Sequence, residues 1–111
     1  MKDYNDMSDF EINKMAAFLN GIAPDEEQYH SHGDRIDGVL YCNGEKVVDY
    51  CHDVIDMWPL IVENKIDVCF IDSANSWTSF GLTKNKLLVD SSGDNPLRAA
   101  AIVYLMLKDE K

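Results

Sequence analysis

The sequence predicts an α+β fold in which an antiparallel sheet is covered by about three helices that pack mainly on one of its faces. Helical patterns lie near both ends of the chain and around Pro59, whereas the strand patterns between them are joined by short turns. Strands that follow one another through turns, instead of alternating regularly with helices, favour antiparallel pairing. The chain has 111 residues, a length typical of one domain, so we expect a single globular domain over residues 1–111.

The first helix is predicted over residues 9–20. Ser8 and Glu11 have the spacing of a capping box, in which each side chain binds a backbone N–H that the helix leaves free. Gly21 is placed to end the helix in the left-handed conformation. The expected apolar face follows the helical period and consists of Ile12, Met15, Ala16 and Leu19.

A β-hairpin is predicted around Asn43-Gly44, the dipeptide most favoured for a two-residue turn. Its strands are expected over residues 36–42 and 45–51. Symmetric pairing across this turn places Leu40 opposite Val47.

The segment around Pro59 predicts a broken helix. A residue before proline is pushed away from helical angles, so Trp58 should mark a break between a helical turn at 53–57 and a helix that Pro59 opens. Three short strands are then expected over residues 68–72, 77–81 and 87–90.

The last helix is predicted to begin with Asn95 as its cap and Pro96 in its first turn. Residues 99–107 carry no charge and no polar face, and a helix that is apolar all round has to be covered on every side. One side is expected to meet the sheet, and the rest is covered either by the other helices or by a second copy of the protein or a partner protein. In the second case a homodimer forms through Ala99, Ile102, Val103 and Met106.

The charge is strongly unbalanced, with 20 acidic and 10 basic residues and a net charge of −10. This balance argues against direct binding of nucleic acid, which needs clustered Lys and Arg. The acids either keep the surface solvated or form a negative face for a basic partner protein. The candidate residues of such a face are Asp3, Asp6, Asp9, Asp25, Glu26 and Glu27, with Trp77 as a contact anchor.

Two side-chain groups are candidates for chemical sites. His30, His32 and Asp34 alternate, so in an extended segment they point the same way and could bind zinc or nickel, but no fourth ligand accompanies them. Cys51 and His52 could form a thiol with its base, yet neighbouring strand residues point to opposite faces, so Cys51 is expected to be a buried core thiol. The glycines form no phosphate-binding motif. We therefore expect neither enzymatic activity nor a cofactor.

The expected location is the cytoplasm. The three cysteines form no CxxC pair, and their odd number indicates free thiols in a reducing compartment. The sequence contains no apolar run near the roughly 20 residues that span a bilayer and no signal-peptide core, so no membrane association is expected.

Three single residues carry further expectations. Trp58 and Trp77 are expected to lie in the core, although tryptophan is also enriched at interfaces. Arg98 lies in the first turn of the last helix, where the helix dipole disfavours a cation, so it is expected to have a definite carboxylate partner.

Four stretches of the chain, in this order, resemble the NinX-like proteins, small proteins of tailed phages and prophages of enteric bacteria. The stretches are residues 7–14, 50–53, 58–66 and 95–103. The resemblance implies a phage-encoded protein that works in the bacterial cytoplasm, and it implies no catalytic residue.

The leading hypothesis from these observations is an accessory protein without enzymatic activity that binds a host or phage protein. In a narrower form, it imitates the charge of nucleic acid and inhibits a host defence or DNA-processing protein. The alternatives are a small metal-binding protein or enzyme that uses His30, His32 and Asp34, and a self-assembling structural protein.

Overall fold

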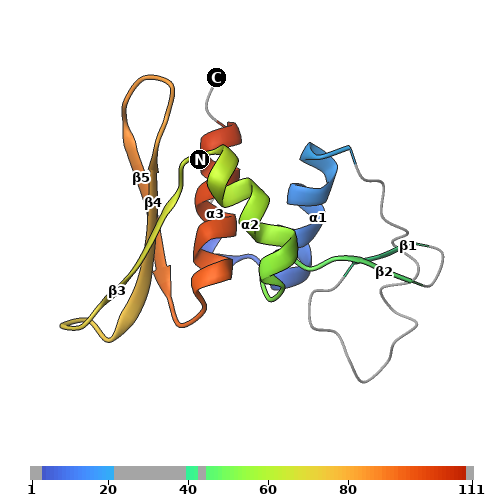
Figure 1. Ribbon diagram of the computed structural model, residues 1–111, viewed down its shortest axis with the longest axis horizontal. Coiled ribbons are helices and arrows are strands. Elements are labelled where there is room, and N and C mark those ends of the chain that lie inside the picture. Colours follow the sequence, from blue (N-terminus) through green and yellow to red (C-terminus); the bar gives the residue numbers. More distant parts are fainter. Residues whose placement is uncertain (1–3, 22–39, 43–44, 110–111) are drawn as a thin grey trace.

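The computed structural model describes residues 4–21, 40–42 and 45–109 (Figure 1). Within them the chain forms, in order, the short 3-10 helix η1 (Tyr4–Asp6), α1 (Asp9–Leu19), β1 (Leu40–Cys42), β2 (Glu45–Val48), α2 (Val54–Glu63), β3 (Asp67–Ile71), β4 (Ser76–Leu82), β5 (Leu88–Gly93) and α3 (Pro96–Asp109).

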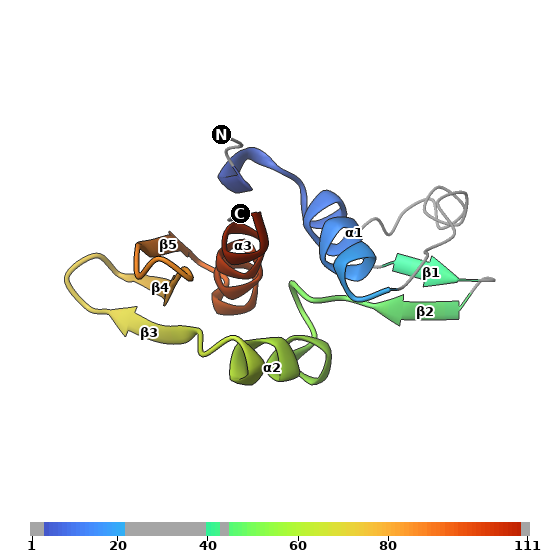
Figure 2. The same cartoon turned by 90° about the horizontal axis from the view of Figure 1, so that it is seen from above.

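The architecture confirms the predicted α+β class. Strands β3, β4 and β5 form an antiparallel sheet in that order, and α3 lies against it (Figure 2). Helices α1 and α2 pack against other sides of α3, so all three helices lie on one side of the sheet. The hairpin of β1 and β2 forms a separate two-stranded sheet beside α1.

The inner face of the sheet is made of small residues that let α3 approach closely. Ser79, Gly81 and Ser91 are buried on the central and neighbouring strands. A Cβ added at Gly81 would lie 3.2 Å from Cδ1 of Leu107 and 3.4 Å from Cγ1 of Val103. The absence of a side chain at this position therefore sets the distance between β4 and α3.

Helix α3 is covered from within the chain. Every residue from Ala99 to Leu105 is at most 2% exposed, and Met106 is partly buried against the same core. Of the alternatives for the side of α3 that carries Ala99, Ile102, Val103 and Met106, cover by the other helices is therefore the one that the structure shows. The sheet takes one side of the helix, and α1 and α2 take the others, which removes the surface on which the homodimer was based.

Helix α1 has the predicted ends. The Oγ of Ser8 accepts the Glu11 N–H at 3.2 Å, and Oε1 of Glu11 accepts the Ser8 N–H at 3.0 Å. Gly21 has a φ of +77°, the left-handed conformation expected after a helix. The capping box and the glycine stop are thus both confirmed.

The buried face of α1 is rotated from the predicted one. Ile12 and Ala16 are buried as expected, but Asn13 and Ala17 are also fully buried, while Leu19 is 47% exposed. The expectation that Leu19 belongs to the core face is wrong. The reason is that α1 packs at once against α3 and against the turn that follows β2, where Asn13 finds polar partners.

Helix α2 is continuous, so the predicted break at Trp58 is wrong. Asp53 caps the helix, its Oδ1 accepting the Ile55 N–H at 2.9 Å. Pro59 has no N–H to bond the Ile55 carbonyl one turn earlier, and Ile55 is 78% exposed, so this side of the helix borders solvent. Met57, Leu60 and Ile61 hold the helix on the core through both sides of the proline.

The strand predictions hold with local differences. Cys42 pairs with Glu45 as expected, but Leu40 pairs with Val48 instead of Val47 because the register shifts by one residue. The second strand of this hairpin ends at Val48, and residues 49–53 turn toward α2. Strands β3 and β4 lie within one residue of their predicted bounds, and β5 extends to Gly93.

Candidate functional site

The outer side of α2 carries large apolar side chains in contact with solvent. Val54, Ile55, Trp58 and Val62 are 53%, 78%, 57% and 57% exposed, and we call these four residues the α2 face. Val54, Trp58 and Val62 are four residues apart in succession, so they lie along one side of the helix. The expectation that Trp58 lies in the core is wrong, because the core side of α2 is taken by other residues.

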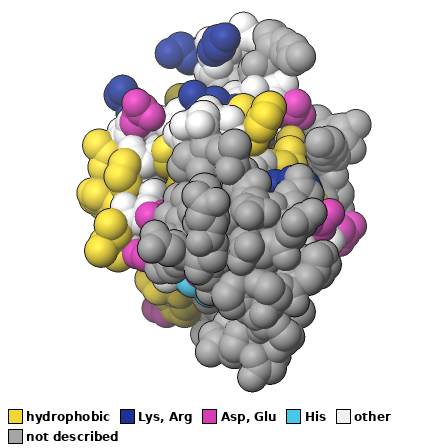
Figure 3. Space-filling model, turned by 90° about the vertical axis from the view of Figure 1, so that its right-hand side faces the viewer, with side chains coloured by type: hydrophobic (Ala, Val, Ile, Leu, Met, Phe, Trp, Pro, Cys, Tyr) yellow, Lys and Arg dark blue, Asp and Glu magenta, His cyan; other side chains and the backbone are white. Residues whose placement is uncertain are grey.

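Acidic residues lie near both ends of α2. Asp53 and Asp56 lie at the start of the helix and Glu63 at its end, and the sequence has no Lys or Arg between residues 47 and 64. Oδ2 of Asp56 accepts the Asp49 N–H at 2.8 Å, which fixes this carboxylate beside the helix. Figure 3 shows hydrophobic side chains with acidic ones beside them along the left-hand edge of that view.

The α2 face could have been found from the sequence. Apart from Asp56 and Glu63, every residue from Val54 to Glu63 is apolar, so this helix also lacks a polar side. The absence of a polar side, from which the last helix was expected to be covered all round, is found in this helix as well. The predicted break at Pro59 divided the segment into pieces too short to show it.

A second group of residues joins α1, the turn after β2, and α3. The side-chain amide of Asn13, fully buried, donates to Oδ1 of Asp49 at 3.0 Å, and its Oδ1 accepts the Cys51 N–H at 3.1 Å. Asp49 is 5% exposed. Nδ2 of Asn95 donates to the Cys51 carbonyl at 2.7 Å, which ties the start of α3 to the same turn.

The ion pairs of this group lie at its edge. Arg98 Nη1 lies 2.6 Å from Oδ1 of Asp9, which confirms the expected carboxylate partner, and Nη2 donates to the Met7 carbonyl at 2.6 Å. His52 lies between two carboxylates, with Nε2 3.2 Å from Asp9 and Nδ1 3.1 Å from Asp49. We call the whole group the polar cluster; it consists of Asp9, Asn13, Asp49, Cys51, His52, Asn95 and Arg98.

The polar cluster is built for holding the fold together, and its thiol is poorly suited to nucleophilic chemistry. Cys51 is fully buried, as expected from the sequence. Burial raises the pKa of the Cys51 thiol well above its ordinary value, and the nearby negative charge of Asp9 raises this pKa further. A thiol that holds its proton is a weak nucleophile.

We expect Cys51 to react with Ellman's reagent at pH 8 at least about a hundredfold more slowly in the folded protein than in urea, because both access and the thiolate fraction are reduced. The measurement uses the double variant Cys42→Ser, Cys69→Ser, in which Cys51 is the remaining thiol. A variant that keeps Cys69, which is half-buried, is the comparison and should react faster. Equal rates for the folded and unfolded double variant would show that Cys51 is accessible and ionised.

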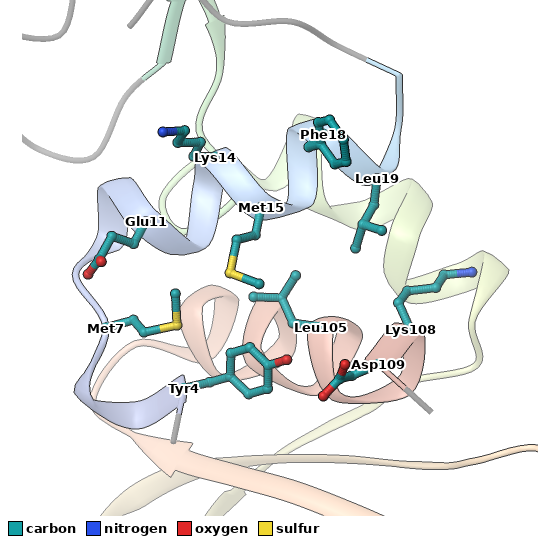
Figure 4. A pocket seen from close by; sticks show the side chains of 10 residues that line it. All are labelled: Tyr4, Met7, Glu11, Lys14, Met15, Phe18, Leu19, Leu105, Lys108 and Asp109. Carbon is teal, nitrogen blue, oxygen red and sulfur yellow. The ribbon is translucent and has the colours of Figure 1, made fainter. Parts of the chain in front are cut away.

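A cavity of about 600 Å³ opens between η1, α1 and the end of α3 (Figure 4). Met7 and Met15 point toward Leu105 at its centre, whereas the amino groups of Lys14 and Lys108 point away. The ten lining residues are Tyr4, Met7, Glu11, Lys14, Met15, Phe18, Leu19, Leu105, Lys108 and Asp109. Two bases and two acids among them leave the rim without net charge.

The predicted acidic face is brought together only in part. Asp6 is exposed, whereas the carboxylate of Asp9 is engaged within the chain by Arg98 and His52. The assignment of these residues to a partner-binding surface stays a prediction. Trp77 is half-buried, with its ring 5.3 Å from that of Phe70 in an edge-to-face contact. Asp3, Asp25, Glu26, Glu27, His30, His32 and Asp34 lie outside the described residues. The metal site therefore stays a prediction, and the described ranges hold no group of three metal-ligating side chains.

The described part of the chain has no helix long and apolar enough to cross a membrane. The α+β fold is similar to that of the crystal structure of a phage protein from Bacillus cereus ATCC 14579, with a TM-score of 0.65 and 13% sequence identity. The match covers 100% of this chain and 96% of that one. No curated protein matches the chain.

The chain belongs to the bacteriophage P22 NinX family, whose profile matches residues 3–108. The family assignment confirms the resemblance seen in the sequence. Three of the four stretches that carried it, 7–14, 50–53 and 95–103, meet in the polar cluster. The fourth, 58–66, lies in α2 and the residues that follow it.

Proposed function

We propose that this NinX-family protein is a phage or prophage accessory protein that has no enzymatic activity and acts in the bacterial cytoplasm by binding a host or phage protein. The observation that carries the proposal is the α2 face. Large exposed apolar side chains that lie together are typical of protein-binding surfaces, and tryptophan is among the residues most enriched at their energetic centres.

The proposal places Trp58 at the centre of the contact. Trp58 lies in the middle of α2, with Val54 one turn before it and Val62 one turn after it. Burying a large apolar side chain in an interface stabilises the complex by roughly 1.5–3 kcal/mol. The core side of α2 is already packed, so the helix can present this face without unfolding.

The exposed apolar face supports binding by apolar contact more than imitation of nucleic acid. Such imitation needs rows of free carboxylates. Of the acidic residues proposed for this face, the structure describes Asp6, which is exposed, and Asp9, which is paired with Arg98. The narrower hypothesis of an acidic inhibitor is therefore carried by the overall charge of −10 alone.

The test is a pull-down from lysates of infected and uninfected host cells at moderate salt, with three baits of identical charge. These are the wild-type protein, Trp58→Ser and Phe18→Ser, the last removing an aromatic side chain that is 76% exposed on α1. We expect a protein that is captured by the wild type and by Phe18→Ser and is lost with Trp58→Ser. The proposal fails if all three baits capture the same set, or if the wild type captures nothing above a charge-matched control protein.

A further inference from the structure

We propose that a basic surface at the C-terminal ends of α2 and α3 binds a small molecule that carries a chain of phosphate groups. Residues 83–87, the turn between β4 and β5, complete this surface. The proposal is independent of the proposed function, because the α2 face lies along the helix and the basic surface lies at the end of it. It is based on a local excess of lysine side chains in a protein whose net charge is −10.

Two adjoining hollows, of about 270 and 380 Å³, form this surface. Figure 1 shows the ends of α2 and α3 and the turn between β4 and β5 at the same end of the molecule, and basic side chains gather toward that end at the top of Figure 3. Both hollows are lined by Asn64, Leu82 and Thr83. Two lysines line each of them: Lys84 and Lys108 the smaller hollow, Lys65 and Lys86 the larger one.

Positive charge dominates the lining. These four lysines are among the ten basic residues of the chain, whereas Asp67 is the acidic residue among the described side chains that line the hollows. Glu63 and Asp109 lie close by in the sequence but do not line them. Within the described ranges, no ion pair joins any of the four lysines to a carboxylate. Their ammonium groups are therefore available to an anion from outside the chain.

Two of the four lysines have a backbone conformation that lysine rarely adopts. The angle φ is +54° at Lys65 and +65° at Lys86, and among the described residues Asn75 is the other non-glycine position with a positive φ. The left-handed region is disfavoured by a Cβ atom, so that glycine or asparagine usually occupies it. Residues that are kept there against this preference concentrate at functional sites. The strain thus points to a use for the two lysines.

Hydrogen bonds fix both strained positions. The Lys65 N–H donates to the Val62 carbonyl at 3.3 Å, at the place after a helix that glycine usually takes. In the turn, the Lys86 N–H donates to the Thr83 carbonyl at 2.9 Å. Thr83 is 6% exposed, and its Oγ1 accepts the Leu87 N–H at 3.1 Å. The surface is therefore formed before a ligand arrives, which reduces the entropic cost of binding.

The arrangement favours a short chain of phosphates over other anions. Two lysines in each of two adjoining hollows match an elongated ligand with several negative groups, and a phosphate group carries more charge than a carboxylate. A small ligand responds mainly to charges within the Debye length of about 8 Å. A nucleic-acid strand would extend beyond the hollows, and the net charge of −10 would repel its further phosphates.

The test measures the binding of inorganic triphosphate by isothermal titration calorimetry at about 0.1 M salt. The double variant Lys65→Gly, Lys86→Gly removes two of the lysines and supplies the residue that both left-handed positions prefer. The double variant Lys14→Gln, Lys46→Gln removes the same charge from α1 and β2 and is the matched control. Adenosine triphosphate and a single-stranded DNA of about 12 nucleotides are the further probes. Circular dichroism gives the melting temperature of each protein without ligand.

We expect triphosphate to bind the wild type and the matched control with affinities within about twofold, and to bind the glycine variant at least about tenfold more weakly. The melting temperature of the glycine variant should stay the same or rise, because glycine adopts a positive φ without steric cost. Tighter binding of adenosine triphosphate than of triphosphate identifies a nucleotide as the ligand, and equal or weaker binding identifies the bare phosphate chain.

Four results would overturn the proposal. Triphosphate fails to bind the wild type, or it binds the glycine variant as tightly as the wild type, or the matched control loses as much affinity as the glycine variant. The fourth is DNA binding that is tighter than that of either phosphate compound and is lost in the glycine variant, which would make the surface a nucleic-acid interface. A lowered melting temperature together with lost binding would likewise assign these lysines a structural role and contradict the proposal.

Discussion

The substitution Asn13→Asp is expected to destabilise the protein by more than about 3 kcal/mol at pH 7, a large part of the stability of a small domain. The amide that now donates to Asp49 at 3.0 Å would be replaced by an oxygen that can only repel it while both groups are ionised. Asn13 is fully buried and Asp49 is 5% exposed, so water cannot screen the two charges.

The loss caused by Asn13→Asp should depend on pH, and the direction follows from the pKa of the introduced carboxyl. Burial beside another carboxylate raises this pKa in the folded state above the value of about 3.9 in the unfolded chain. A raised folded-state pKa contributes stability below the unfolded pKa, and this contribution is lost as the pH rises toward the folded pKa. The variant should therefore lie closest to the wild type near pH 4 and fall behind it toward pH 7.

Urea unfolding from pH 4 to pH 7 measures this effect. Asn75→Asp is the matched control, because it adds the same charge on the exposed turn between β3 and β4. The control should follow the wild type within about 0.5 kcal/mol across the range. A pH-independent loss for Asn13→Asp would mean that the introduced carboxyl reaches solvent.

The second large effect is expected for Arg98→Met, which should lower the free energy of unfolding by about 2–3 kcal/mol. The substitution leaves Asp9 without its 2.6 Å partner and removes the donor from the Met7 carbonyl, also at 2.6 Å. The side chains of Arg98 and Asp9 are 24% and 29% exposed, so partial screening keeps the cost below that of a fully buried pair.

A double-mutant cycle with Asp9→Asn isolates the contribution of the pair itself, and a coupling energy of at least about 1 kcal/mol is expected. Arg98→Lys should recover less than half of the loss, since an ammonium group cannot reach the carboxylate and the carbonyl with the geometry of a guanidinium fork. Lys84→Met, at an exposed position in the turn between β4 and β5, is the control for loss of one positive charge. A loss for Arg98→Met no larger than that of Lys84→Met would contradict the structural role of the ion pair.

The features that the sequence predicted correctly depend on residues close together in the chain. The capping box of Ser8 and Glu11, the pairing of Cys42 with Glu45 and the cap at Asn95 each need only their immediate neighbours. The prediction that Arg98 has a carboxylate partner is also confirmed, because the helix dipole disfavours a cation near a helix N-terminus unless an acidic group lies beside it. The partner itself, 89 residues away, could not be named from the sequence.

The features that could not be predicted depend on how the helices pack against one another in the folded chain. The sequence holds two apolar helices, and only packing decides that α3 becomes the core while α2 keeps one side in solvent. The local preference of proline against a helix interior predicts a break in α2. The burial of Met57 and Ile61 on either side of Pro59 outweighs that preference, and neither contact can be seen in the sequence. The burial of Asn13 likewise follows from a turn 36 residues away that supplies its hydrogen bonds.

The wide sequence separation within the polar cluster has a consequence for the order in which the protein is completed. During synthesis α1 leaves the ribosome before the sheet and α3, yet its carboxylate Asp9 is paired with Arg98, which is translated 89 residues later. The sheet and α3, by contrast, come from the contiguous stretch 67–109 and need no earlier segment for their mutual packing. A nascent chain therefore carries α1 without its ionic partner until Arg98 has been synthesised, and α3, the last of the described elements in chain order, is the one against which the others pack.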